Sequence, residues 1–255
     1  SEEQLKRVQK QAVERGLTLR RQNKIDGRPY IVRHLCIDEK SLFTGHHYVS
    51  IIYDGQTGAV LEVVEHRTQD AAQSAFTNLG DYVNLADVQV VTMDMWKAFF
   101  NAAKKCIPQA DIVHDRFHLA QYLNNAVDIT RRAENKRLRK NKDESLKNTK
   151  YLWLKNPDNF TEKQAEKHKE LLGREELDTV RAWKLKEEFK QFFLQKDVLK
   201  AALFFESWTD KVIQLRNKSL RKVATMMGNH WENIISYAKH RVSNAMAESV
   251  NSSIH

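Results

Sequence analysis

Glycine and proline are scarce in this sequence, with 8 Gly and 3 Pro among 255 residues. These two residue types dominate tight turns, so their scarcity disfavours the many short hairpins of a β-sandwich or barrel. It favours long helices instead. Apolar residues make up 41% of the chain, which is enough for a packed core and excludes a disordered protein.

Several classes of protein are disfavoured by simple patterns. The sequence has no apolar run of 18 or more residues, which predicts that no segment spans a membrane. Residues 1–20 are charged throughout and lack the apolar stretch of a secretory signal. Cys36 and Cys106 are the two cysteines and have no paired spacing, so we expect reduced thiols in the cytoplasm rather than a disulfide or zinc framework.

Residues 31–114 alternate between β-rich and helical patterns. A hairpin followed by strand–helix units predicts an α/β fold, a mixed sheet with helices on its faces. Gly55 and Gly58 lie between two β-rich runs and mark the hairpin turn. The predicted strands are 31–39, 47–54, 59–65, 88–93 and 110–114, and the predicted helices are 69–79, 95–106 and a long one from residue 117.

The second half of the chain is almost entirely helical in pattern. Thr161 followed by Gln164 predicts a capping box that opens a helix. We therefore predict a large all-helical insertion at 125–240 that interrupts the sheet domain. The other predicted parts are an N-terminal helix or linker at 1–30, the first part of the core at 31–124, and a final core helix at 241–255.

Two aspartates come directly after apolar strands, Asp38 in HLCIDEK and Asp94 in VVTMDMW. Side chains just past neighbouring strands of an open α/β sheet converge in one crevice. Two carboxylates there would suit magnesium, which takes hard oxygen ligands. The residue types leave two alternatives open, in which Asp94 caps the helix after it and Asp38 is a surface charge.

A third acidic candidate is Glu248, near the end of the chain. On a helix it shares one polar face with Asn244, Asn251 and His255, at spacings of 4, 3 and 4 residues. Acidic residues on helices are usually solvated, so this pattern alone also fits a surface position.

Four segments carry a resemblance to a known family. In order, CIDEKSLFTGHHYVSIIYD, VVTMDMWKAFFNAA, ADIVHDRFH and HRVSNAMAESVNSSI resemble the bacterial insertion-sequence transposases of the ISL3 type. The similarity runs from about residue 32 to residue 254. It implies a DDE transposase with an RNase H-like core and a helical insertion domain, in the cytoplasm of a bacterium and associated with the nucleoid.

The resemblance also implies roles for particular residues. Asp38, Asp94 and Glu248 match the D, D and E of the family, which implies that they hold two Mg²⁺ or Mn²⁺ ions. Asp115 and His118 match a DxxH signature and become further catalytic candidates. The residues alone leave open that Asp115 caps a helix and that His118 bonds within the core. The implied chemistry is hydrolysis and strand transfer at one site, without a covalent enzyme intermediate.

The net charge of +9 suits a polyanionic partner, and residues 129–155 carry ten basic against three acidic side chains. This stretch is expected to lie along a DNA backbone, although a solvated helix face is the alternative for each single side chain. Trp231 is a candidate for stacking on a base, with core packing as its alternative. The predicted DNA-binding residues are Arg131, Arg132, Arg137, Arg139, Lys140 and Trp231.

The implied partners are double-stranded DNA with terminal inverted repeats, target DNA and a second copy of the chain. Family members also have an N-terminal zinc-binding and helix-turn-helix region, and they continue past the glutamate. The chain resembles only the tail of that region, and seven residues follow Glu248. We therefore expect a transposase catalytic domain, either whole or truncated. The alternatives are a catalytically inactive remnant that binds DNA or regulates transposition, and an RNase H-like nuclease.

Overall fold

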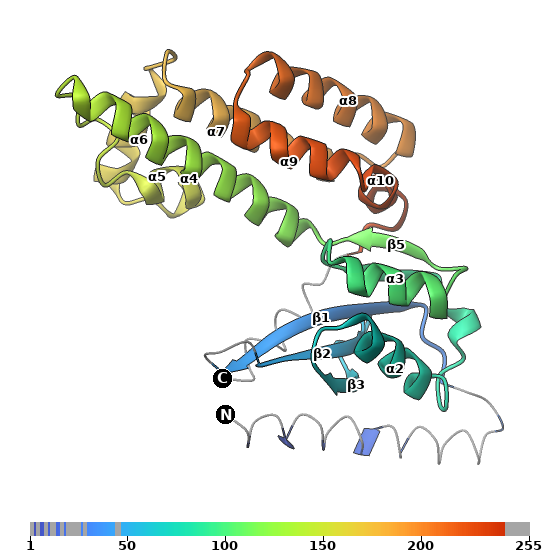
Figure 1. Cartoon of the computed structure of the whole chain (residues 1–255). Coiled ribbons are helices and arrows are strands. Elements are labelled where there is room, and N and C mark those ends of the chain that lie inside the picture. Colours follow the sequence, from blue (N-terminus) through green and yellow to red (C-terminus); the bar gives the residue numbers. More distant parts are fainter. Residues whose placement is uncertain are drawn as a thin grey trace. The chain divides into compact units, whose positions relative to one another are not determined.

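The computed structural model describes residues 30–43 and 47–242, together with a few single positions before residue 30. The chain divides into two compact units (Figure 1). A sheet unit runs up to Asp115 and resumes at His240, and a helical unit comprises Arg116–Lys239.

The sheet unit contains a five-stranded mixed sheet in the order β3-β2-β1-β4-β5 (Figure 1). The first three strands are antiparallel neighbours, and β4 and β5 continue the sheet parallel to β1. This confirms the predicted α/β fold with a mixed sheet. The strands are β1 (His34–Phe43), β2 (His47–Asp54), β3 (Val60–Glu65), β4 (Val90–Met93) and β5 (Asp111–His114).

Two helices, α2 (Gln69–Leu79) and α3 (Lys97–Cys106), pack on one face of this sheet. The core between them contains Leu35 and Ile37 of β1, both fully buried. Because side chains alternate along a strand, His34, Cys36 and Asp38 lie on the opposite face. The sequence of β1 thus separates an apolar face for packing from a polar face.

The order of strands and helices agrees with the prediction, and some bounds differ. The first strand begins at His34 rather than at residue 31 and continues past Asp38. Helix α3, predicted at 95–106, begins at Lys97, with Trp96 at the N-cap position and no side-chain cap bond. The alternative role of Asp94 as the cap of this helix is therefore wrong.

The helical unit begins with a 25-residue helix, α4 (Arg116–Lys140). Along the chain it is followed by α5 (Lys150–Leu154), α6 (Glu162–Leu172), α7 (Asp178–Phe189), α8 (Val198–Gln214), α9 (Lys218–Gly228) and α10 (Trp231–His240). Thr161 and Gln164 form the predicted capping box at the start of α6.

Aromatic side chains fill much of the interior of the helical unit. Trp153 is fully buried and meets the rings of His168 and Trp183 edge to face. Trp208 is also fully buried, against Phe189, with ring centroids 4.7 Å apart, and its indole N–H donates to a backbone carbonyl of α7. These tryptophans serve packing, which is the usual role of buried aromatic residues.

Within residues 30–43 and 47–242, no helix is both long enough and apolar enough to cross a membrane.

Candidate active site

Three aspartates occupy matching positions along the parallel strands: Asp38 lies within β1, and Asp94 and Asp115 directly follow β4 and β5. Cys36 pairs with Thr92 across β1 and β4, and Met93 pairs with His114 across β4 and β5. Continuing these two registers sets Asp38 opposite Asp94, and Asp94 opposite Asp115. The backbone N–H of Asp115 donates to the carbonyl of Met93 at 2.9 Å, so the ladder of β4 and β5 reaches the third acid.

The three aspartates differ in burial. Asp38 and Asp94 are half-buried, whereas Asp115 is 1% exposed. Asp38 accepts a hydrogen bond from the backbone N–H of Glu39 at 2.8 Å, and Asp94 accepts one from that of Met95 at 2.6 Å. Two neighbouring, partly solvated carboxylates offer the oxygen donors that a hard divalent cation takes.

A buried polar layer lies on the same face of the sheet, next to the three aspartates. The Nε2 atom of His34 bonds to the hydroxyl of Thr92 and lies 3.4 Å from the sulfur of Cys36. A side chain at Gly55 would collide with this imidazole, because an added Cβ would lie 2.2 Å from its Nδ1 atom. The glycine therefore lets the hairpin close over His34.

Burial keeps the thiol of Cys36 protonated. It raises the pKa of Cys36 to about 12, and although a hydrogen bond from Thr92 opposes this, the carboxylates of Asp115 and Asp38 add to it. A thiol is a weak nucleophile compared with a thiolate, so Cys36 is not a candidate for covalent catalysis.

His34 makes the stability of the sheet unit depend on pH. Burial lowers its pKa from 6.5 to about 4, against an opposing effect of Asp54. The unfolded chain therefore binds a proton near pH 6.5 that the folded chain binds only near pH 4, and stability falls as the pH drops through this window. The expected total loss is about 3 kcal/mol.

Replacing His34 by Gln is expected to remove this contribution. Urea unfolding of wild type and variant between pH 7 and pH 4 measures the difference, and residues that titrate equally in both proteins cancel. His230→Gln in the helical unit is the matched control and should follow the wild-type profile. Parallel profiles for wild type and His34→Gln would contradict the assignment.

The remaining predicted catalytic residues are distributed as follows. His118 is a half-buried residue of α4 in the helical unit, where its ring meets Phe117 edge to face at 5.8 Å. Glu248 lies outside the described residues. Within residues 30–43 and 47–242, no three Asp, Glu, His or Cys side chains converge closely enough to hold a metal ion.

The predicted DNA-binding arginines differ in how available their charges are. Arg131 is 8% exposed and pairs with Asp128 at 2.7 Å, so its charge serves the helix itself. Arg132 and Arg137 are exposed but also have acidic partners. Arg139 and Lys140 are exposed, with no ion pair among the described residues.

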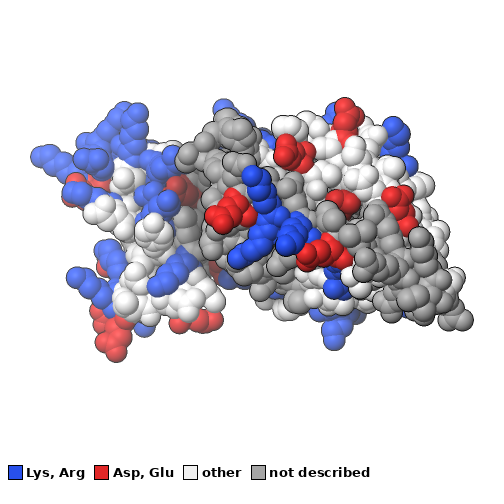
Figure 2. Space-filling model, turned by 90° about the horizontal axis from the view of Figure 1, so that it is seen from below, with Lys and Arg blue, Asp and Glu red and all other residues white. Residues whose placement is uncertain are grey.

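Two more cations of the basic stretch belong with Arg139 and Lys140. Lys136 and Lys142 are exposed near the end of α4 and likewise form no ion pair in the part of the chain that the structure describes. Figure 2 shows blue side chains outnumbering red ones at the left of the view, the end of the helical unit where α4 ends. The sequence predicted the basic stretch, but spacing did not separate its paired side chains from its unpaired ones.

Trp231 lies at the start of α10 and is 41% exposed. It borders an open cavity of about 570 Å³ together with Leu199 and Leu203. The described residues that line this cavity include Glu206 and Asp210 and no lysine or arginine. An apolar cavity with acidic side chains does not suit a polyanion, so we leave Trp231 out of the proposed DNA contacts.

The sequence pattern did not reveal Arg67, which lies directly before the N-cap of α2. It pairs with Glu39, the neighbour of Asp38, and its carbonyl accepts a hydrogen bond from the indole of Trp96. These partners are 28 and 29 residues away in sequence, so no local spacing could have indicated the contact.

Two comparisons show which known proteins this chain is similar to. The model of the ISL3-type DDE family, described as transposase, matches residues 35–255. A transposase for insertion sequence element IS1001 from Bordetella parapertussis is 26% identical over 227 residues, which is 88% of this chain and 55% of the relative. The chain thus spans about half the length of that relative. Since the family model matches most of its residues, the chain belongs to the ISL3-type family of insertion-sequence transposases.

Proposed function

We propose that this chain is the catalytic part of a DDE transposase that cuts DNA at the ends of an insertion sequence and joins those ends to target DNA. The observation that carries the proposal is the register of β1 and β4, which, continued by two residues, sets Asp38 within β1 opposite Asp94 directly after β4, in a chain of this family. Three antiparallel strands followed by alternating helices and parallel strands support an RNase H-like core.

In this proposal Asp38 and Asp94 hold divalent ions together with Glu248, which lies outside the described residues. The carboxylate oxygens of the described pair fit Mg²⁺ or Mn²⁺. Two such ions would lower the pKa of a bound water and stabilise the leaving 3′-oxygen during in-line attack on phosphorus. Asp115 places a third carboxyl group in register beside Asp94, and His118 is assigned to contact the scissile phosphate or to orient a carboxylate.

We also propose a division of labour along the chain. The segment 31–124 with the returning segment 241–255 forms the catalytic core, and 125–240 forms the insertion, after an N-terminal linker at 1–30. We move the first border of the insertion to Arg116, because α4 continues without a break from Arg116 to Lys140. The active complex is proposed to be a homodimer on DNA with terminal inverted repeats, in the bacterial cytoplasm at the nucleoid.

The end of α4 is proposed to contact the phosphate backbone. The exposed cations that support this are Lys136, Arg139, Lys140 and Lys142, with Arg132 and Arg137 as weaker members because acidic partners offset their charges. Each phosphate that a cation neutralises releases counterions and makes affinity fall with salt.

Replacing Lys136, Arg139, Lys140 and Lys142 together by Gln is expected to flatten the salt dependence of DNA binding. The slope of log affinity against log salt should fall by about 2 to 4, since each lost phosphate contact removes about 0.9. Fluorescence anisotropy between 50 and 300 mM salt measures this slope.

The matched control replaces four other exposed lysines of the helical unit, Lys163, Lys169, Lys196 and Lys200, by Gln. It changes the net charge by the same amount and should change the slope by less than about 1, because only direct contacts release counterions. Equal effects of the two variants would mean that the end of α4 attracts DNA through net charge alone.

Incubation of the chain with Mg²⁺ or Mn²⁺ and labelled terminal-repeat DNA tests the proposed function. Cleavage followed by joining to a target supports a transposase. Cleavage without joining would instead favour a nuclease of the RNase H-like class. Binding without cleavage would favour a remnant that interferes with an intact transposase.

A further inference from the structure

Arg67 joins three parts of the sheet unit through residues that neighbour Asp38 and Asp94 in sequence. One Nη atom lies 2.8 and 3.2 Å from the two carboxylate oxygens of Glu39 in β1. The guanidinium carbon lies 4.0 Å from the ring centroid of Tyr48 in β2 and 4.8 Å from that of Trp96. The backbone carbonyl of Arg67 accepts a hydrogen bond from the Trp96 indole at 3.0 Å.

Backbone pairing between β1 and β4 does not reach Asp38 and Asp94, so another contact has to fix the distance between these two residues. The register of β1 and β4 ends at Cys36 and Thr92, two residues before either acid. On the other side of β4, by contrast, a backbone hydrogen bond reaches Asp115 itself. Backbone pairing therefore fixes Asp94 relative to Asp115 more directly than relative to Asp38.

The clamp made by Arg67 acts on both sides of this gap. Glu39 follows Asp38 directly, so its ion pair holds the backbone of β1 at that point. Trp96 is two residues after Asp94, and α3 has no side-chain cap that would fix this connection. The planar guanidinium suits the task, because it can pair with a carboxylate while it stacks on aromatic rings.

We propose that Arg67 is a positioning residue, which sets the separation of Asp38 and Asp94 and thereby the affinity of the site for divalent ions. The inference rests on the proposed function, since it assumes that this pair of acids holds the ions. Residues that hold ligands in place typically change metal affinity or activity by about 10- to 100-fold when they are removed.

Replacing Arg67 by Ala is expected to weaken Mn²⁺ binding, measured by isothermal titration calorimetry, by about tenfold or more. The Mg²⁺ concentration for half-maximal DNA cleavage should rise in parallel, with DNA affinity unchanged. Arg67→Lys should recover part of the loss, because lysine keeps the charge but not the fork. Trp96→Phe keeps an aromatic ring, loses only the indole bond, and should shift both readouts in the same direction by a smaller factor.

The matched control is Arg174→Ala in the helical unit. The Arg174 side chain is 33% exposed, close to the 34% of Arg67, and it also binds carboxylates, those of Asp143 and Glu176. This control should leave Mn²⁺ affinity and Mg²⁺ dependence as in the wild type. The control thereby distinguishes the general effect of removing a half-buried arginine from the specific effect of removing the contacts of Arg67.

Two outcomes overturn the inference at different levels. If folded Arg67→Ala and Trp96→Phe bind Mn²⁺ as the wild type does, while Asp94→Asn does not, the positioning role is wrong and the metal site stands. If Asp94→Asn also binds Mn²⁺ as the wild type does, the metal site fails and the role of Arg67 fails with it.

Discussion

Replacing Asp94 by Asn is expected to slow metal-dependent DNA cleavage by about 10³-fold, a larger effect than the one expected for Arg67→Ala. The amide keeps the size of the side chain but removes the negative charge that a divalent ion needs. Metal ions stabilise charge in such transition states by several kcal/mol, and each 1.36 kcal/mol is a factor of ten in rate. Single-turnover cleavage of labelled DNA measures the loss, and Asp38→Asn should behave alike.

DNA affinity separates this catalytic defect from a general one. The dissociation constant for the same DNA in Ca²⁺ should change less than about twofold, because cations elsewhere supply most of the binding. Asp70→Asn, an exposed acid in the first turn of α2, makes the same change of charge and should cleave normally. Wild-type rates for both Asp38→Asn and Asp94→Asn would refute the assignment of the pair.

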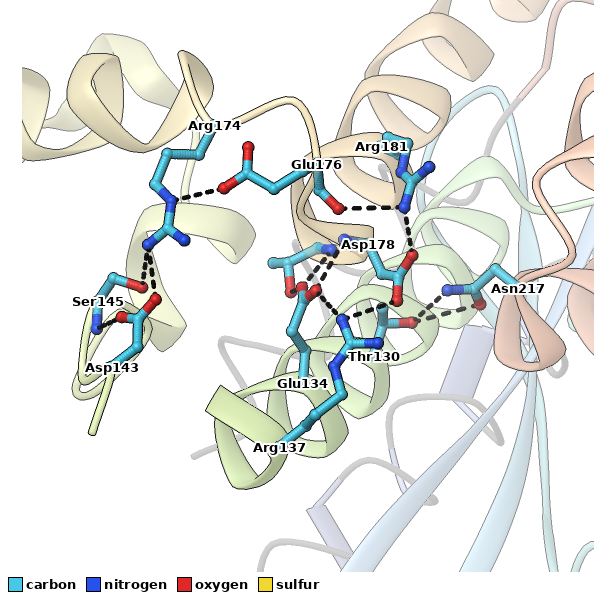
Figure 3. Close-up of polar contacts among 11 residues, drawn as sticks. Thr130, Glu134, Arg137, Asp143, Ser145, Arg174, Glu176, Asp178, Arg181 and Asn217 are labelled. Atoms are coloured by element: carbon cyan, nitrogen blue, oxygen red, sulfur yellow. Dashed lines mark hydrogen bonds and ion pairs between the residues drawn. The ribbon is translucent and has the colours of Figure 1, made fainter. Parts of the chain in front are cut away.

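Replacing Glu134 by Ala is expected to destabilise the helical unit by about 3 kcal/mol. Glu134 is a buried acid of α4 whose carboxylate caps the start of α7 (Figure 3). It accepts hydrogen bonds from the backbone N–H groups of Asp178 and Thr179, at 2.9 and 2.8 Å, and from the hydroxyl of Thr179, at 2.7 Å. Its removal leaves these donors without their acceptor and Arg137 without its nearest partner.

Denaturant unfolding of the full chain, followed by tryptophan fluorescence, measures this effect. Trp153 and Trp208 are buried in the helical unit and report on its packing. Glu144→Ala is the matched control, because Glu144 pairs with Lys147 at the surface and such pairs contribute about 0 to 1 kcal/mol. Equal unfolding midpoints for Glu134→Ala and wild type would contradict the capping role.

The sequence predicted those features that depend on neighbours along the chain. β-rich and short apolar runs located the five strands that the structure describes, and the hairpin strand at His47–Asp54 and the helix at Gln69–Leu79 have the predicted bounds. Asp94 directly follows β4, as its place after an apolar run predicted, whereas Asp38 lies inside β1, which continues to Phe43.

Contacts between distant segments could not be read from spacing. Glu134 and Thr179 are 45 residues apart, and the role of the acid appears only when α7 packs on α4. Arg131 looks like any other cation in a basic stretch until burial beside Asp128 is known. The helix after β4 begins at Lys97, later than its apolar pattern suggests, and the indole of Trp96 at its N-cap position bonds to the carbonyl of Arg67, 29 residues earlier.

The proposed catalysis requires Asp38, Asp94 and Glu248 to meet around divalent ions. A crystal structure of the chain with Mn²⁺ and terminal-repeat DNA, with anomalous scattering to locate the metal, tests this most directly. We expect manganese within coordination distance of carboxylate oxygens of all three residues. Manganese bound elsewhere, or a Glu248 carboxylate remote from the other two, would contradict the proposed chemistry.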